Sequence, residues 1–156
     1  MMNKGRPIRI LFVCHGNICR SPMAEFYMKD LVAKRGLADR FEIASAATST
    51  DEIGNPPYPG TRKKLAEVGI SCEGKHARQL RPSDYDDYDL LIGMDEANIR
   101  NMRHKYHDDP QGKIYKMLEF AGSERDVADP WYTGDFDQTF EDVADGCTGL
   151  LGWLRL

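Results

Sequence analysis

Ten residues near the N-terminus, Val13-Cys14-His15-Gly16-Asn17-Ile18-Cys19-Arg20-Ser21-Pro22, contain the strongest structural signal in this chain. They follow an apolar run at 8–13 that is typical of a strand buried on both faces. Pro22 then suits a first helical position, and apolar side chains continue at helical spacing up to Gly36. A loop between a strand and a helix leaves backbone N–H groups unpaired at the helix start, where an anion can bind. The stretch therefore predicts a phosphate loop between the first strand and the first helix.

Further strands and helices follow from the apolar pattern of the rest of the chain. Strands are expected at 41–46, 89–94 and 113–118, and helices at 61–68, at 95–106 and from Asp135 or Asp137 to about residue 154. Residues 48–60 and 119–134 are expected to be loops. The alternation predicts an α/β fold with a four-stranded parallel sheet and helices on both faces, as a single three-layer domain over residues 1–156.

The carboxyl ends of these strands are the expected place for a ligand, as in other open parallel sheets. The loop at Cys14, the segment after Ser45, Asp95 and the loop 119–134 all lie at such ends, so we expect them to converge on one site. The last helix adds an open question, because it contains Gly146, Gly149 and Gly152. Glycine costs a helix about 1 kcal/mol relative to alanine. Either this helix packs very closely on another element or its end is frayed.

The composition limits the class of protein. The chain has 156 residues, 41% hydrophobic and 29% charged, with net charge -4 and a pI near 5.6, so we expect no nucleic-acid and no membrane partner. Residues 1–9 lack the apolar segment of a signal peptide, which favours a cytoplasmic protein with reduced thiols. The cysteine spacing does not fit structural zinc. We expect a monomer with at most a weak dimer.

The predicted loop contains the groups that phosphoryl transfer requires. Cys14 opens the loop in a positive field that favours its thiolate, and the thiolate is the nucleophile. Arg20 closes the loop with a planar fork that matches two phosphate oxygens. Ser21 is expected to hydrogen-bond the Cys14 sulfur. A buried structural cysteine is the simpler interpretation of Cys14, but the strand, loop and helix around it favour the catalytic one.

A phosphate ester also needs an acid that protonates the leaving oxygen. Our candidate is Asp129, in the segment Asp129-Pro130-Trp131-Tyr132, because it lies in a loop and two aromatic rings follow it. Asp-Pro is also an ordinary turn starter. On chemistry alone, Asp95, Asp51 and Glu52 remain alternatives.

The segment 13–22 resembles the signature of the low-molecular-weight protein tyrosine phosphatases, and the resemblance extends over nearly the whole chain. Other matching segments, in the family's order, are 45–49 (SAATS), 54–57 (GNPP), 76–79 (HARQ), 88–90 (YDL), 94–96 (MDE) with Asn98, and 129–132 (DPWY). The resemblance implies hydrolysis of phosphotyrosine in proteins or peptides through a phosphocysteine, with inorganic phosphate as product, no cofactor and no metal. It implies Cys14 as nucleophile, Arg20 as phosphate clamp, and Asp129 as general acid and then general base.

The resemblance also implies roles for residues around the nucleophile. The phosphate-binding loop would consist of His15, Gly16, Asn17, Ile18, Cys19 and Arg20. A polar network that shapes the loop would consist of Asn17, Ser21, Ser45 and His76. Cys19 would be a redox partner that traps oxidised Cys14 as a disulfide. A small packing residue is the simpler interpretation of Cys19.

The chain departs from the family at the rim of the cleft, whose walls would be Asp51, Trp131 and Tyr132. The family usually has an aromatic residue where this chain has Asp51, and ring stacking is worth about 0.5–1.5 kcal/mol. We therefore expect weaker binding of aryl phosphates, or a preference for peptides with basic neighbours, unless Trp131 takes over the stacking. Tyr58-Pro59-Gly60 also replaces an acidic residue, so the path of that loop is open.

Other functions on the same loop fit less well. Arsenate reductases of this type need additional, closely spaced cysteines, and residues 81–89 contain none. Phosphoarginine phosphatases typically have threonine where this chain has Ile18, whose branched side chain would restrict that pocket. A binding domain without activity would be expected to lose Cys14, Arg20 or Asp129, and all are present.

Overall fold

The computed structural model describes residues 5–156; residues 1–4 of the N-terminal segment considered above lie outside the described residues. The elements in chain order are β1 (Ile8–Cys14), α1 (Arg20–Lys34), the short helix η1 (Ala38–Arg40), β2 (Phe41–Ala47), α2 (Pro59–Glu67), α3 (Asp84–Asp87), β3 (Leu90–Gly93), α4 (Glu96–Lys105), β4 (Ile114–Lys116), the short helix η2 (Met117–Ala121), α5 (Pro130–Thr133) and α6 (Phe136–Trp153). The sheet has four parallel strands in the order β2-β1-β3-β4, which confirms the predicted fold class.

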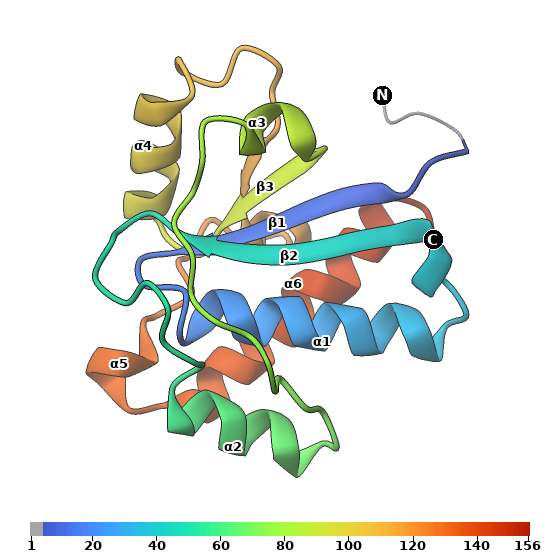
Figure 1. The fold of residues 1–156 in the computed structure, drawn as a ribbon. Coiled ribbons are helices and arrows are strands. Elements are labelled where there is room, and N and C mark those ends of the chain that lie inside the picture. The colour runs from blue at the N-terminus through green and yellow to red at the C-terminus, as the bar shows by residue number, and fades with distance from the viewer. Residues whose placement is uncertain (1–4) are drawn as a thin grey trace.

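Helices cover both faces of the sheet (Figure 1). In β1, Ile10 and Phe12 lie in a core shared with α1, α2 and α6, whereas Leu11 and Val13 pack on the other face with α3 and α4. All four side chains are fully buried. Two covered faces explain why this strand is apolar from Ile10 to Val13 rather than alternating. Strand order reverses at β1, which places the loop after Cys14 at the switch point where such folds bind ligands.

The first helix begins earlier than expected. It starts at Arg20, so Pro22 is the third helical residue and not the first. Both positions lie in the first turn, where a backbone N–H has no partner within the helix, so proline is tolerated at either. The earlier start draws Arg20 into the helix and buries its side chain.

The segment after β4 differs most from the prediction. The strand ends at Lys116, and Met117 and Leu118 belong to η2, where both are buried. An apolar run of this length fits a strand or a buried short helix equally well, so the pattern could not separate them. The expected loop at 119–134 contains the end of η2 and the four-residue helix α5.

Close packing explains the glycines of α6. A Cβ added at Gly146 would collide with the Met117 side chain, and one at Gly149 would overlap the backbone carbonyl of Phe120. Gly152 faces open space. The first two glycines therefore let η2 lie directly against α6, and only the last is unconstrained by neighbours. Among residues 5–156, no helix is long and apolar enough to cross a membrane.

Candidate active site

Cys14 lies at the carboxyl end of β1 and is 3% exposed. The expected contact with Ser21 is present, with the hydroxyl oxygen 3.0 Å from the sulfur. The backbone N–H of Ser21 also points at this sulfur, at 3.4 Å, from the first turn of α1. The sulfur thus lies against the first turn of α1, where the helix start is the positive end.

Asn17 holds the turn of the loop. Its backbone is left-handed, with φ of 62°, a conformation that asparagine adopts more readily than most residues. The fully buried side chain donates to the hydroxyls of Ser21 at 2.8 Å and Ser45 at 2.9 Å, and accepts from the Arg78 backbone at 3.1 Å. Because every polar atom of the amide is used, the loop conformation is set before any ligand binds.

The network continues to a buried carboxylate. Ser45 donates to Glu25 Oε1 at 2.6 Å, and Lys75 Nζ lies 3.1 Å from the same oxygen and donates to the Ser45 carbonyl at 3.0 Å. Lys29 binds the other Glu25 oxygen at 2.6 Å. Burial lowers the pKa of Lys75, although the Glu25 charge opposes that shift.

The prediction that His76 belongs to this network is wrong. The His76 side chain is exposed and its Nδ1 contacts only the Gly74 carbonyl, at 3.1 Å. Lys75, one residue earlier, points inward instead. Sequence reasoning missed Lys75, but a signal was present: Glu25 falls on the apolar face of the predicted helix with Met28 and Val32, and a carboxylate buried there needs a cation.

Arg20 is a buried charged residue of the site and is 2% exposed. Its Nη1 donates to Asp95 Oδ2 at 2.7 Å and to the Val127 carbonyl at 3.0 Å, and its Nη2 lies 3.4 Å from Asp129 Oδ2. Burial by itself would lower the pKa of Arg20, but Cys14 and the two carboxylates raise it overall. Its Nε is buried without a hydrogen-bond partner among the described residues.

Asp95 and Asp129 hold Arg20 from two different strand ends. Asp95 is the predicted N-cap of α4 and forms a capping box with Asn98, its Oδ1 accepting from the Asn98 N–H at 2.8 Å. Asp129 is the N-cap of α5 and accepts from the Trp131 N–H at 3.1 Å. The hydrogen bond between Asp95 and Arg20 was not predicted from the sequence. The feature that could have predicted it is an acidic N-cap directly after β3, the strand that pairs with β1.

A cavity of about 180 Å³ opens at Cys14. It is lined by Cys14, His15, Gly16, Ile18, Cys19, Arg20, Asp51, Glu52, Asp129, Trp131 and Tyr132. The expected convergence of strand ends is therefore confirmed, because these residues come from the segments that follow β1, β2 and β4, and Asp95 joins them from β3 through Arg20.

The rim has one polar wall and one aromatic wall. On the polar side, Asp51 Oδ2 lies 2.8 Å from His15 Nε2, and both side chains are more than half exposed. On the other, the exposed Trp131 ring meets Tyr58 edge-on at 5.1 Å, and Tyr58 stacks on Phe136 at 5.9 Å. The path of the loop at 58–60, which the sequence left open, therefore places Tyr58 between Phe136 and Trp131.

Cys19 ends the loop as the N-cap of α1, lines the cavity and is 4% exposed. Burial, together with Cys14 and Asp129, raises its pKa to about 12. Cys19 is therefore a neutral thiol at physiological pH. None of Cys14, Cys19, Cys72 and Cys147 forms a disulfide.

Comparison with known proteins gives one family. The model of the family "Low molecular weight phosphotyrosine protein phosphatase" matches residues 9–155. The chain is similar to the low molecular weight protein-tyrosine-phosphatase YfkJ of Bacillus subtilis, with 42% identity over 95% of this chain and 96% of YfkJ. It is 38% identical to PtpA of Staphylococcus epidermidis over 94% of each.

Solved structures agree. The crystal structure of YfkJ superposes with a TM-score of 0.93 at 41% identity over 98% of both chains. The Drosophila arginine phosphatase DARP superposes with a TM-score of 0.88 at 27% identity, over 96% of this chain and 99% of DARP. Because the family model matches nearly the whole chain and the relatives align over almost their full length, the chain belongs to the low molecular weight phosphotyrosine protein phosphatases, whose activity is the hydrolysis of phosphotyrosine.

Proposed function

We propose that this chain hydrolyses phosphotyrosine in proteins or peptides with Cys14 as nucleophile, Arg20 as phosphate clamp and Asp129 as general acid and base. The Cys14 thiolate attacks phosphorus and the bond to the tyrosine oxygen breaks, while Asp129 gives its proton to that oxygen. Water then attacks the phosphocysteine, Asp129 takes a proton from it, the sulfur–phosphorus bond breaks, and inorganic phosphate leaves. The loop amides and Arg20 bind the equatorial oxygens, on which charge is spread in both transition states.

The observation that carries this proposal is the unpartnered Nε of Arg20. A buried N–H without a partner costs about 1–3 kcal/mol, so this group on a residue that lines a cavity indicates a ligand oxygen. The same cavity wall contains the sulfur of Cys14. A phosphoryl group bound there would satisfy the guanidinium and lie next to the nucleophile.

Two variants test the assigned roles with aryl phosphates. We expect Cys14→Ser to abolish turnover of p-nitrophenyl phosphate, because the serine hydroxyl is not ionised. We expect Asp129→Ala to lower kcat/KM for phenyl phosphate far more than for p-nitrophenyl phosphate, whose leaving group hardly needs a proton. Activity that survives in the cysteine variant would overturn the mechanism.

The rim supports a preference for phosphotyrosine flanked by basic residues. Asp51 and Glu52 line one side of the cavity, where His15 Nε2 lies 2.8 Å from Asp51 Oδ2. Trp131 and Tyr132 supply the aromatic surface on the other side, where Tyr58 supports Trp131. We expect peptides with arginine beside phosphotyrosine to have a higher kcat/KM than matched peptides with glutamate, and Asp51→Asn to reduce that ratio.

Phosphoarginine is the competing substrate, since one structural relative is an arginine phosphatase. Ile18 argues against it, because its buried, branched side chain lines the cavity and narrows it. Parallel assays with phosphotyrosine and phosphoarginine decide between the two substrates.

Other features of the chain remain proposals. We propose that residues 1–156 form one phosphatase domain, because one sheet positions every site residue named above. A cytoplasmic location is supported by the need of Cys14 for a reduced thiol, and cell fractionation tests it.

Redox protection by Cys19 is supported by its place in the cavity wall beside Cys14; absence of a Cys14–Cys19 disulfide after mild peroxide would refute it. A monomer with at most a weak dimer is tested by sedimentation.

A further inference from the structure

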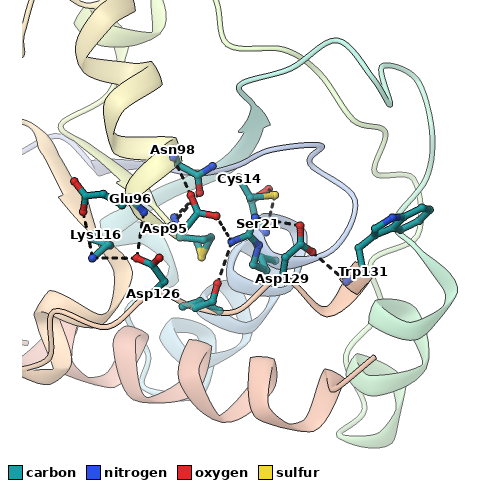
Figure 2. Close-up of polar contacts among 12 residues, drawn as sticks. Cys14, Ser21, Asp95, Glu96, Asn98, Lys116, Asp126, Asp129 and Trp131 are labelled. Atoms are coloured by element: carbon teal, nitrogen blue, oxygen red, sulfur yellow. Dashed lines mark hydrogen bonds and ion pairs between the residues drawn. The ribbon is translucent and has the colours of Figure 1, made fainter. Parts of the chain in front are cut away.

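A lysine at the end of β4 lies beside the loop that carries Asp129. The side chain of Lys116 is 10% exposed, and its Nζ lies 3.0 Å from Asp126 Oδ1 and 3.3 Å from Glu96 Oε2 (Figure 2). Burial alone would lower the pKa of Lys116, but the hydrogen bonds that it donates to Asp126 and Glu96 raise it. The ammonium is therefore charged and shared between two elements that meet at the site.

Asp126 connects this lysine to the start of α4. Its Oδ1 also accepts a hydrogen bond from the Glu96 N–H, at 3.1 Å, in the helical turn that Asp95 caps. One carboxylate oxygen thus joins the carboxyl end of β4, the N-terminus of α4 and the loop before Asp129. Without the ammonium of Lys116, the negative charges of Asp126 and Glu96 would repel each other.

The residues on either side of Asp126 are fixed as well. Arg125 binds both oxygens of the buried Asp142 on α6, at 3.0 and 2.8 Å. Val127 donates to the Met94 carbonyl at 2.9 Å and accepts from Arg20 at 3.0 Å. Asp129 follows two residues later, with its side chain 24% exposed. Residues 125–127 are therefore a rigid base from which the acid projects.

We propose that Lys116 and Asp126 form a clamp that positions Asp129 for proton transfer, so that both are positioning residues for the reaction. The inference rests on the general-acid role proposed above for Asp129. Geometry is the physical reason, since displacement of a reacting group by about 1 Å can cost about a hundredfold in rate. The clamp does not line the cavity. It borders two segments of the site, the one that leads to Asp129 and the one in which Val127 and Asp95 hold Arg20. Only an effect through Asp129 depends on the leaving group, since only Asp129 supplies its proton.

The test compares two leaving groups in variants of Lys116. We expect Lys116→Met to lower kcat/KM for phenyl phosphate about tenfold and for p-nitrophenyl phosphate less than twofold, because only the first requires full proton transfer. Lys116→Arg keeps the charge and should restore most of the phenyl phosphate activity. Lys113→Met is the matched control, because Lys113 adjoins the same strand but donates to the Tyr85 carbonyl, away from the acid loop. It should leave both values unchanged.

A double variant separates positioning from general destabilisation. In an Asp129→Ala background, Lys116→Met should cause no further loss with phenyl phosphate, since the group that it positions is gone. Equal losses on both substrates, or losses that multiply in the double variant, would overturn the clamp. If Lys116→Met does not fold, Asp126→Asn answers the same question, because it keeps an acceptor for the Glu96 N–H and removes the charge.

The same data distinguish the two proposals. If Asp129→Ala itself shows no dependence on the leaving group, the acid role fails and the clamp fails with it. If Asp129→Ala shows the dependence and Lys116→Met and Asp126→Asn do not, only the clamp is wrong.

Discussion

Replacing Asp95 with asparagine separates two functions that one side chain performs. Asp95 Oδ1 caps α4 by accepting from the Asn98 N–H at 2.8 Å, whereas Oδ2 accepts from Arg20 Nη1 at 2.7 Å. Asparagine is an equally good N-cap and keeps the first bond. Its amide nitrogen then faces Arg20 as a second donor, so the bond to the guanidinium is lost while the helix start is preserved.

The size of the effect follows from the burial of Arg20. A hydrogen bond between charged groups is worth about 1.5–3 kcal/mol, and Arg20 is 2% exposed, so water does not replace it. If that free energy serves to hold Arg20 for the transition state, kcat/KM should fall roughly 10- to 150-fold, since each 1.36 kcal/mol is tenfold in rate. Asp95→Ala should show a similar loss of activity and unfold with about 1 kcal/mol less stability than the asparagine variant, because it also removes the cap.

The assay is steady-state hydrolysis of p-nitrophenyl phosphate together with urea unfolding. Asp135→Asn is the matched control: Asp135 caps α6 by accepting from the Gln138 N–H at 2.9 Å, and its carboxylate has no contact with Arg20. That variant should keep full activity. If Asp95→Asn stays within twofold of the parent in kcat/KM, the reasoning about Arg20 is refuted.

Three further predictions concern the packing and the charges around the site. Gly149→Ala should lower the free energy of unfolding by about 1–3 kcal/mol, because its Cβ would overlap the Phe120 carbonyl. Gly152→Ala should leave the free energy of unfolding unchanged or raise it by up to about 1 kcal/mol. Equal effects of the two variants in urea unfolding would contradict this packing. Lys75→Met should lower stability by about 1–3 kcal/mol through the buried Glu25, and His76→Ala by less than about 0.5 kcal/mol; the reverse order would restore the prediction for His76. The pKa of Cys19 is raised from 9.0 to about 12, so between these pH values the folded state keeps a thiol proton that the unfolded state loses. The free energy of unfolding should therefore fall with rising pH in this range, by up to about 1.4 kcal/mol per pH unit. Cys19→Ala should remove the contribution of this thiol to the pH dependence.

The parts of the fold that could be predicted from sequence are those determined by local pattern. The apolar run before Cys14 predicts a strand covered on both faces, and β1 is that strand. The acidic N-cap of α4 was likewise visible, because Asp95 precedes a helical pattern and is followed three residues later by Asn98. Such signals depend on neighbours along the chain and need no knowledge of distant segments.

The errors occur where distant segments compete for the same residues. Met117 and Leu118 continue the apolar pattern of β4, but they form η2 because the glycines of α6 leave room for a helix to lie there. His76 and Lys75 are adjacent and both basic, and only the path of the segment between α2 and α3 decides that the lysine reaches Glu25. Local sequence contains no information on which of the two side chains points inward.

The sequence by itself determined the strand, loop and helix around Cys14, and with them an anion-binding loop, because spacing and residue type along ten residues are sufficient for it. Only the tertiary structure decided how that loop is supported. Arg20 binds Asp95, which follows β3, and Asp129, which lies in the segment after β4. Asn17 donates to Ser45 of β2. These contacts join residues up to 109 positions apart, so they follow from the order of the strands in the sheet and not from any local pattern.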